Sequence, residues 1–138
     1  MQQLINGCID IADEVANGKI ADPYDEQNTE LVESQFSFNS IRDFSDNIVS
    51  ILNIYKGIDG SESLSLYVAE KDSALDEQVE NEIQLAIDAI GAISPDNNPP
   101  FRDAILDSSK RDEIEAAQDA IRKVMDTFSG PVMNTLYE

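Results

Sequence analysis

The sequence predicts an all-α protein, a four-helix bundle, and three observations lead to this prediction. Apolar residues recur at steps of three and four along four long segments, which is typical of helices with one buried face. Gly and Pro residues gather between these segments. The 138 residues are 41% hydrophobic, which is enough to bury a core despite a formal net charge of −19. We therefore expect a single bundle domain over residues 1–138.

The first helix is expected from about Gln2 to Ala16. Its apolar stripe consists of Leu4, Cys8, Ile11 and Val15. Asn17-Gly18 is a helix stop signal. Pro23 disfavours helical geometry at Asp22, so the following residues have loop character. We therefore expect a long irregular connection between helices 1 and 2, from about Lys19 to Asn39.

A second helix is predicted from about Ser40 to Lys56, where Gly57 ends it. Its stripe consists of Ile41, Phe44, Ile48, Leu52 and Tyr55. Ser40 as the N-cap, with Asp43 three residues later, fits a variant of the capping box. The segment Ser61–Lys71 alternates partly like a strand, but a lone strand would have no pairing partner. We expect a short helix there.

The third helix is expected to start at Asp72 or Ser73 and to reach about Ile93. It has a heptad-like seam of Leu75, Val79, Ile83, Ala86, Ile90 and Ile93. Taken together with the other stripes, this seam predicts a common core. Its expected members are Phe44, Ile48, Leu52, Ile83, Ile90, Ile121 and Val124.

A short extra helix is predicted before helix 4, because Pro100 is well placed as the first residue of a helix that reaches about Leu106. The fourth long helix starts near Ser109. Its stripe consists of Ile114, Ala117, Ile121, Val124 and Phe128. Gly130-Pro131 should break or kink that helix.

The composition argues against several classes of function. Nine Lys and Arg residues against 28 Asp and Glu residues speak against nucleic acid and anionic lipid as partners. The absence of histidine excludes a His general base, a His metal ligand and a Ser-His-Asp triad. Cys8 is the single cysteine and is expected to be a small core residue. We find neither a signal peptide nor a run of about 18 apolar residues, so we expect no transmembrane segment.

Two acidic clusters are interpreted as solvated helix faces. The first contains Asp76, Glu77, Glu80 and Glu82, and the second contains Asp112, Glu113 and Glu115. The second cluster occupies the first turns of a helix, where the helix dipole favours negative charge. A ferritin-like di-iron site would need Glu-x-x-His pairs on facing helices, and the sequence has none.

A group of polar residues around the start of the second helix is the candidate site for a ligand or a domain interface. Its members are Ser37, Asn39, Ser40, Asp43 and Asn47. Asn39, Asp43 and Asn47 step by four and should share one flank of the helix. Their oxygen atoms can bind a hard cation or orient a ligand where another domain docks. The alternative is a purely architectural role, in capping and buried hydrogen bonds. Both interpretations remain open at this point.

Several stretches of the sequence resemble the imelysin-like family. They are Ile11–Val15, Gly18–Pro23, Val32–Ser40, Asp43-Phe44, Asn47 and Asn53–Gly57, followed by Ser63–Ser65, Leu75-Asp76 and Pro100-Phe101. The resemblance covers most of the chain and is most specific up to about Asp76. It implies a parent protein of two helical bundles, whose first half carries a Gly-x-His-x-x-Glu motif that is thought to bind metal. Since this chain has no histidine, we expect it to be the second, C-terminal bundle of such a protein.

The resemblance also implies a function. Family members are linked to bacterial iron uptake or its regulation, outside the cytoplasm, in the periplasm or as cell-surface lipoproteins. We expect no cofactor in this chain, and iron or another divalent metal in the full-length protein. The expected partners are the missing first bundle and an iron-uptake component.

Three functions remain open on the sequence alone. The first is a non-catalytic binding module of an imelysin-like protein. The second is part of an imelysin-type metallopeptidase, because some family members are described as peptidases. The third is an acidic helical protein-interaction domain. The chain lacks the His and Glu pattern of a zinc peptidase, so we expect no catalysis by the chain alone.

Overall fold

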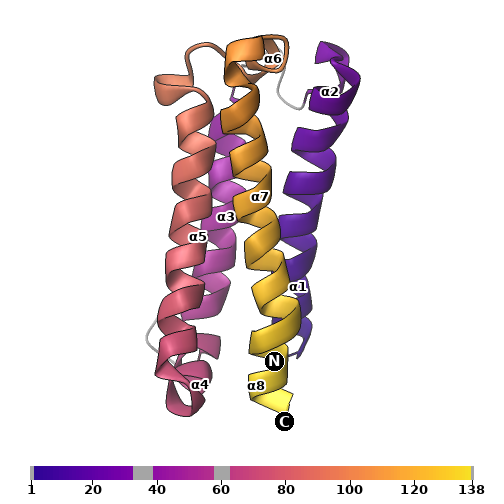
Figure 1. The fold of residues 1–138 in the computed structure, drawn as a ribbon. Helices are drawn as coiled ribbons and strands as arrows, with labels where there is room; N and C mark the ends of the chain where they lie inside the picture. The colour runs from indigo at the N-terminus through magenta and orange to yellow at the C-terminus, as the bar shows by residue number, and fades with distance from the viewer. Residues whose placement is uncertain (1, 33–38, 58–62, 138) are drawn as a thin grey trace.

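The computed structural model describes residues 2–32, 39–57 and 63–137. All regular elements in these ranges are helical and none is a strand, which confirms the predicted all-α class. Four long helices lie side by side, namely α1 (Gln2–Glu14), α3 (Ser40–Lys56), α5 (Ser73–Ile93) and α7 (Arg111–Thr127) (Figure 1). Both α1 and α5 pack against α3 and α7, so the four helices surround one core.

Shorter helices lie at the ends of the long ones. They are α2 (Ala21–Glu26), α4 (Leu64–Lys71), α6 (Phe101–Ala104) and α8 (Met133–Tyr137). Single 3₁₀ turns occur at Thr29–Leu31, Pro95–Asn97 and Ser108–Lys110. The short helices expected after Ser61 and after Pro100 are therefore present as α4 and α6. Asp72 caps α5, with its side chain accepting a hydrogen bond from the Leu75 N–H at 3.0 Å.

The first helix does not stop at Asn17-Gly18. A π-helical turn, Val15–Ile20, joins α1 to α2, so the helical path reaches Glu26. Ile20 and Tyr24 are buried, and this apolar face keeps the segment packed on the bundle. The irregular connection that was expected from Lys19 therefore begins only at Gln27, which has a left-handed φ of 51°. Residues 33–38 of that connection lie outside the described residues.

The stripe predicted for α1 is wrong by one position at two places. Cys8 and Val15 are buried as expected, but Leu4 is 48% exposed and Ile11 is only partly buried. The buried positions are instead Ile5 and Ala12. Each misplaced residue has an apolar neighbour, so the period alone does not fix which of the two faces inward. Burial raises the pKa of the Cys8 thiol to about 12.

The stripes predicted for α5 and α7 are confirmed. All six residues of the α5 seam and all five of the α7 stripe are buried. The predicted common core is also confirmed, except that Leu52 is partly buried and Ile51 takes the fully buried position on α3. Phe44 and Phe101 meet edge to face at 5.1 Å between ring centroids, which fixes α6 over one end of the core.

Gly130-Pro131 does not end the last helix. A second π-helical turn, Phe128–Val132, contains Pro131 and leads directly into α8. The regular hydrogen-bond ladder is already interrupted in a π-turn, so a residue without an N–H group is accommodated there. Phe128 lies in the same turn and meets Tyr55 edge to face at 5.6 Å.

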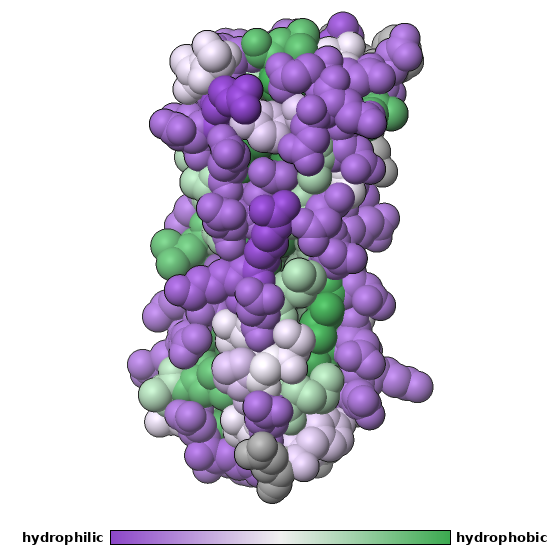
Figure 2. All heavy atoms as spheres, turned by 45° about the vertical axis from the view of Figure 1, so that its right-hand side comes forward, coloured by the Kyte–Doolittle hydropathy of each residue, from purple (hydrophilic) through white to green (hydrophobic). Residues whose placement is uncertain are grey.

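The surface reflects the acidic composition. The face shown in Figure 2 is mostly hydrophilic, with hydrophobic residues gathered mainly in its lower half. Along the described ranges, no helix combines the length and apolar character that a membrane span requires.

Candidate functional site

The predicted polar group lies at the start of α3, except for Ser37, which is outside the described residues. Asn39, not Ser40, is the N-cap, and its side chain makes no capping hydrogen bond. The predicted cap at Ser40 is therefore wrong by one residue. Ser40 is instead the first helical residue and is 1% exposed, because it faces the core side of α3.

The other members of the group share a flank of α3. The Asp43 N–H donates to the Asn39 carbonyl oxygen at 2.9 Å, so the helical repeat starts at Asn39. Residues four apart lie on one flank of a helix, which places Asn47 one turn beyond Asp43. Asn39 is exposed, whereas Asp43 and Asn47 are partly buried. The role of this flank as a site stays a prediction.

The acidic cluster on α5 is not a purely solvated face. The Tyr55 hydroxyl donates to Asp76 Oδ1 at 2.8 Å, and the Ser65 hydroxyl donates to the same oxygen at 2.6 Å. Asp76 thereby connects α3, α4 and α5. Burial of Tyr55, together with its hydrogen bond to Asp76, raises the pKa of the Tyr55 hydroxyl.

Glu82 is the clearest exception in this cluster, because it is 6% exposed. Its Oε1 accepts a hydrogen bond from Gln78 Nε2 at 3.0 Å. Glu77 is exposed, as expected, and Glu80 lies 3.6 Å from the Lys56 ammonium. The prediction of a solvated face is thus wrong for Glu82 and correct for Glu77.

Residues of α7 hold the first π-turn in place. Gln118 is 4% exposed, and its Nε2 donates to the Ala16 carbonyl oxygen at 3.3 Å. One turn further along, Arg122 Nε donates to Asn17 Oδ1 at 2.8 Å. Asn17 in turn donates from Nδ2 to Asp13 Oδ1 at 2.7 Å. The π-turn is therefore fixed by a neighbouring helix and by α1 itself.

The same side of α7 also contacts α2. The Tyr24 hydroxyl donates to Glu115 Oε2 at 3.0 Å, and the Arg111 guanidinium lies 5.5 Å from the Tyr24 ring centroid. Burial and the Glu115 hydrogen bond raise the pKa of the Tyr24 hydroxyl. Glu115 is largely exposed to solvent, yet its carboxylate connects α7 to α2 through this hydrogen bond. The polar residues of α7 that contact the π-turn and α2 are therefore Arg111, Glu115, Gln118 and Arg122.

A cleft of about 260 Å³ opens beside the π-turn. It is lined by Glu14, Gly18, Lys19, Asp22 and Leu31. Glu14, Gly18 and Asp22 follow at steps of four, so the helical path from α1 to α2 brings them to one flank. A Cβ atom at Gly18 would meet no other atom within 4 Å, so the space above this residue is open.

The lining of this cleft is polar and of mixed charge. Glu14 and Asp22 are exposed carboxylates, and Lys19 is a partly buried ammonium. Such a set can hold a polar ligand by ion pairing and hydrogen bonding. Among the residues that the structure describes, no group of three or more Cys, Asp or Glu side chains can hold a metal ion. We therefore assign no metal-centred step to these residues.

The cleft is not predicted from the sequence, because an irregular connection is expected from Lys19 onward where the structure has helix. A signal was present, since Ile20 and Tyr24 continue the apolar spacing of α1 past Gly18. The stop signal at Asn17-Gly18 opposes this continuing period, and the structure follows the period. The lining residues Glu14, Gly18, Lys19 and Asp22 also fall within the stretches Ile11–Val15 and Gly18–Pro23, which carry the family resemblance.

The fold and these surfaces define an acidic helical module that presents polar side chains at one end of its bundle. The Imelysin family model matches residues 1–128, and the chain belongs to the imelysin family.

Solved structures and a curated relative support this assignment. An imelysin peptidase from Bacteroides ovatus is 34% identical, with a TM-score of 0.83, over 99% of this chain and 40% of that one. A putative iron-regulated protein A precursor from Parabacteroides distasonis is 29% identical, with a TM-score of 0.78, over 93% of this chain and 38% of that one. Iron-regulated protein A from Synechococcus elongatus is 27% identical over 95% of this chain and 37% of its own length. This chain therefore spans about two fifths of the length of each of these proteins.

Proposed function

We propose that this chain is a non-catalytic binding module of a larger imelysin-type protein that acts in bacterial iron uptake or its regulation. The observation that carries the proposal is the similarity over nearly the whole chain to two proteins named iron-regulated protein A. The relatives are more than twice as long, which supports a second bundle as the first partner of this module. In this proposal, the metal is held by the larger protein and not by this chain alone.

We further propose that the protein works outside the cytoplasm, in the periplasm or as a cell-surface lipoprotein. The support is the description of the Parabacteroides distasonis relative as a precursor. Fractionation of source cells with an antibody against the chain tests this proposal. Recovery of the protein with cytoplasmic markers would contradict it.

The site proposed for this function is the α3 flank of Asn39, Asp43 and Asn47. Partial burial of Asp43 and Asn47 supports it, because a docked neighbour would complete the enclosure of side chains that are already half covered. In the full-length protein, Asp43→Asn should weaken the binding of Fe³⁺ or Fe²⁺ in a calorimetric titration. Asp46→Asn is the matched control, since Asp46 is exposed on the same helix. Equal affinities of both variants and the wild type would remove this flank from the proposal.

The link to iron itself is tested in cells. Deletion of the gene should lower the uptake of radioactive iron under iron limitation, and the wild-type gene should restore it. The Asp43→Asn gene should restore uptake only in part. Unchanged uptake in the deletion strain would contradict the proposed role.

A second candidate function is a part of a metallopeptidase. It is favoured by the match to the Bacteroides ovatus protein, which is described as an imelysin peptidase. In that case, the full-length protein should cleave a protein substrate, and a chelator should stop the cleavage. The iron uptake assay and the cleavage assay separate the two functions.

A further inference from the structure

Glu82 presents a buried carboxylate oxygen that has no partner in the described part of the chain. Its Oε1 accepts from Gln78, but its Oε2 is buried and makes no hydrogen bond there. The residue is 6% exposed, so most of its side chain is shielded from solvent. An unpaired acceptor of a charged group is costly in a folded protein and calls for an explanation. Neither the fold nor the proposed function uses this oxygen.

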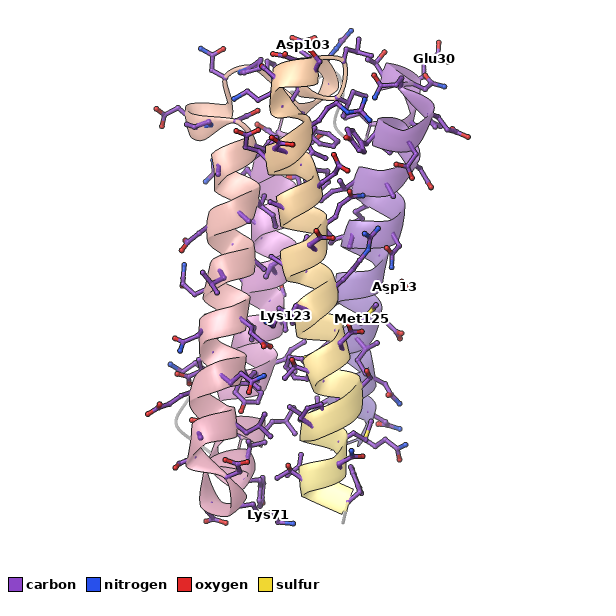
Figure 3. The ribbon with its side chains drawn as sticks, viewed as in Figure 1. Asp13, Glu30, Lys71, Asp103, Lys123 and Met125 are labelled. Carbon is purple, nitrogen blue, oxygen red and sulfur yellow. The ribbon has the colours of Figure 1, made fainter. Side chains whose placement is uncertain are left out.

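Glu82 lines a small pocket between α5 and α7. The pocket has a volume of about 80 Å³, and its other lining residues are Leu85, Ala120 and Lys123. Leu85 is 62% exposed and forms an apolar rim beside the opening. Figure 3 shows Lys123 on α7 at the side toward α5. No ion pair joins Lys123 to Glu82 among the described residues.

Size and lining define the chemistry of the ligand. Cofactor and drug-sized ligands occupy about 300–1,000 Å³, so this pocket accommodates only the end of a single side chain. The carboxylate calls for an N–H donor, and a cationic donor forms the stronger hydrogen bond. A divalent metal would need several oxygen ligands, whereas one carboxylate lines the pocket. The best match is a basic side chain, with an apolar stem against Leu85 and Ala120.

We propose that the Glu82 pocket is a docking site for an arginine side chain on a basic surface of a partner protein. Charge complementarity supports a basic partner, because the chain has a formal net charge of −19. Arginine fits better than lysine, since a guanidinium is less strongly hydrated and loses less on burial. The exposed Leu85 beside the pocket provides an apolar contact, and arginine anchors in such settings are frequent hot spots. Lys123 also lines the pocket, so its ammonium group competes with an incoming arginine for the Glu82 carboxylate.

The test is an NMR titration of the 138-residue chain that follows the methyl groups of Leu85 and Ala120. The cationic probe is N-acetyl-arginine methylamide, and the matched neutral probe is N-acetyl-citrulline methylamide. The arginine probe should cause saturable shifts at these methyl groups, and the citrulline probe should not. Glu82→Gln should weaken the binding of the arginine probe about tenfold, as expected for the loss of a hydrogen bond between charged groups.

Asp88→Asn is the matched control. Asp88 Oδ1 accepts from Gln84 Nε2 at 3.0 Å on the same helix, as Glu82 accepts from Gln78, but this pair is exposed. The control removes the same charge and should leave the affinity for the arginine probe unchanged. Equal loss in both variants would show general attraction to an acidic surface and would overturn the proposal. Equal shifts with both probes, or no saturable shift with either, would overturn it as well.

Lys123→Ala tests the pocket with Glu82 left in place, and remains informative if Glu82→Gln lowers stability. Removal of the competing ammonium should raise the affinity for the arginine probe. A lower affinity would mean that Lys123 is needed for binding, which contradicts its assignment as a competitor. Melting curves of all variants establish that the fold is retained.

Discussion

The side-chain amide of Gln118 donates a hydrogen bond to the Ala16 carbonyl oxygen at 3.3 Å. This contact joins α7 to the π-turn that follows α1. A π-turn displaces the regular helical hydrogen bonds, so its carbonyl groups benefit from partners outside their own helix. Gln118 is buried and supplies such a partner where solvent cannot. The widened turn and its cleft therefore depend on a residue about 100 positions away in the sequence.

Gln118→Leu should destabilise the protein. The substitution replaces the polar amide with an apolar side chain of similar size and leaves the Ala16 carbonyl without its side-chain partner. Loss of a buried hydrogen bond of this kind costs about 1–3 kcal/mol. Urea unfolding followed by circular dichroism measures the change. Asp126→Asn is the control, because Asp126 is exposed on the same helix and should change stability by less than about 0.5 kcal/mol. Equal stability of Gln118→Leu and the wild type would mean that the π-turn does not need this contact.

Ile83→Ala should also destabilise the protein, through a cavity in the core. Ile83 is fully buried on α5, and truncation of a buried Ile to Ala costs about 2–5 kcal/mol. The matched control is Leu85→Ala, since Leu85 lies two residues away and is 62% exposed. Thermal melting should separate the two variants clearly. Similar melting temperatures would contradict the assigned inward face of α5.

Tyr55→Phe tests the hydrogen bond to Asp76. At neutral pH, the variant should lose about 1 kcal/mol, the usual net value of such a bond. The folded protein raises the pKa of the Tyr55 hydroxyl above its unfolded value of about 10. The unfolded state therefore loses this proton first, and the stabilising effect falls as the pH rises above about 10.

The measurement is urea unfolding of the wild type and Tyr55→Phe from pH 7 to pH 11. Their difference should be constant up to about pH 9 and should shrink above about pH 10, since the free tyrosine ionises there. Contributions from other groups, such as Tyr24, are common to both proteins and cancel in the difference. A difference that grows with pH would contradict the sign of this linkage.

The 138-residue chain alone should not hydrolyse peptides. It contains no histidine to act as a general base or as a zinc ligand. Incubation of pure chain with casein and divalent metals, followed by mass spectrometry, measures any cleavage. A mock purification from cells without the gene controls for contaminating proteases. Metal-dependent cleavage above that background, stopped by a chelator, would contradict this expectation.

Much of the fold could be predicted because the apolar periods of α5 and α7 are long and uninterrupted. Each predicted apolar position of these helices is buried as its spacing indicates, and the bounds of α3 and α5 follow from their flanking residues. The phase of α1 could not be fixed, because Leu4 is followed by Ile5 and Ile11 by Ala12. Which of two neighbouring apolar residues faces inward depends on the packing of α3 and α7 against them.

Ile20 and Tyr24 indicate a helix that continues past Gly18, but no local pattern indicates the π-turns or the burial of Glu82. A stop signal at Asn17-Gly18 is a local preference, and the tertiary contact of Gln118 overrides it. Likewise, Glu82 lies in a run of acidic residues whose pattern predicts exposure to solvent. The residue is buried, because α7 packs against this part of α5. The candidate flank of Asn39, Asp43 and Asn47 followed from spacing alone. The titration of the Asp43→Asn variant tests whether this flank takes part in ligand binding.

The burial of Cys8 makes the motion of α1 measurable without any change to the protein. Thiol reagents attack the thiolate, and burial leaves this thiol inaccessible and raises its pKa to about 12. Alkylation can therefore proceed only in the moments when α1 has separated from its neighbours. Since the chain has a single cysteine, each labelled molecule records one such opening. When reclosing is faster than alkylation, the rate of labelling relative to that of a free thiol gives the fraction of molecules that are open at this helix under native conditions.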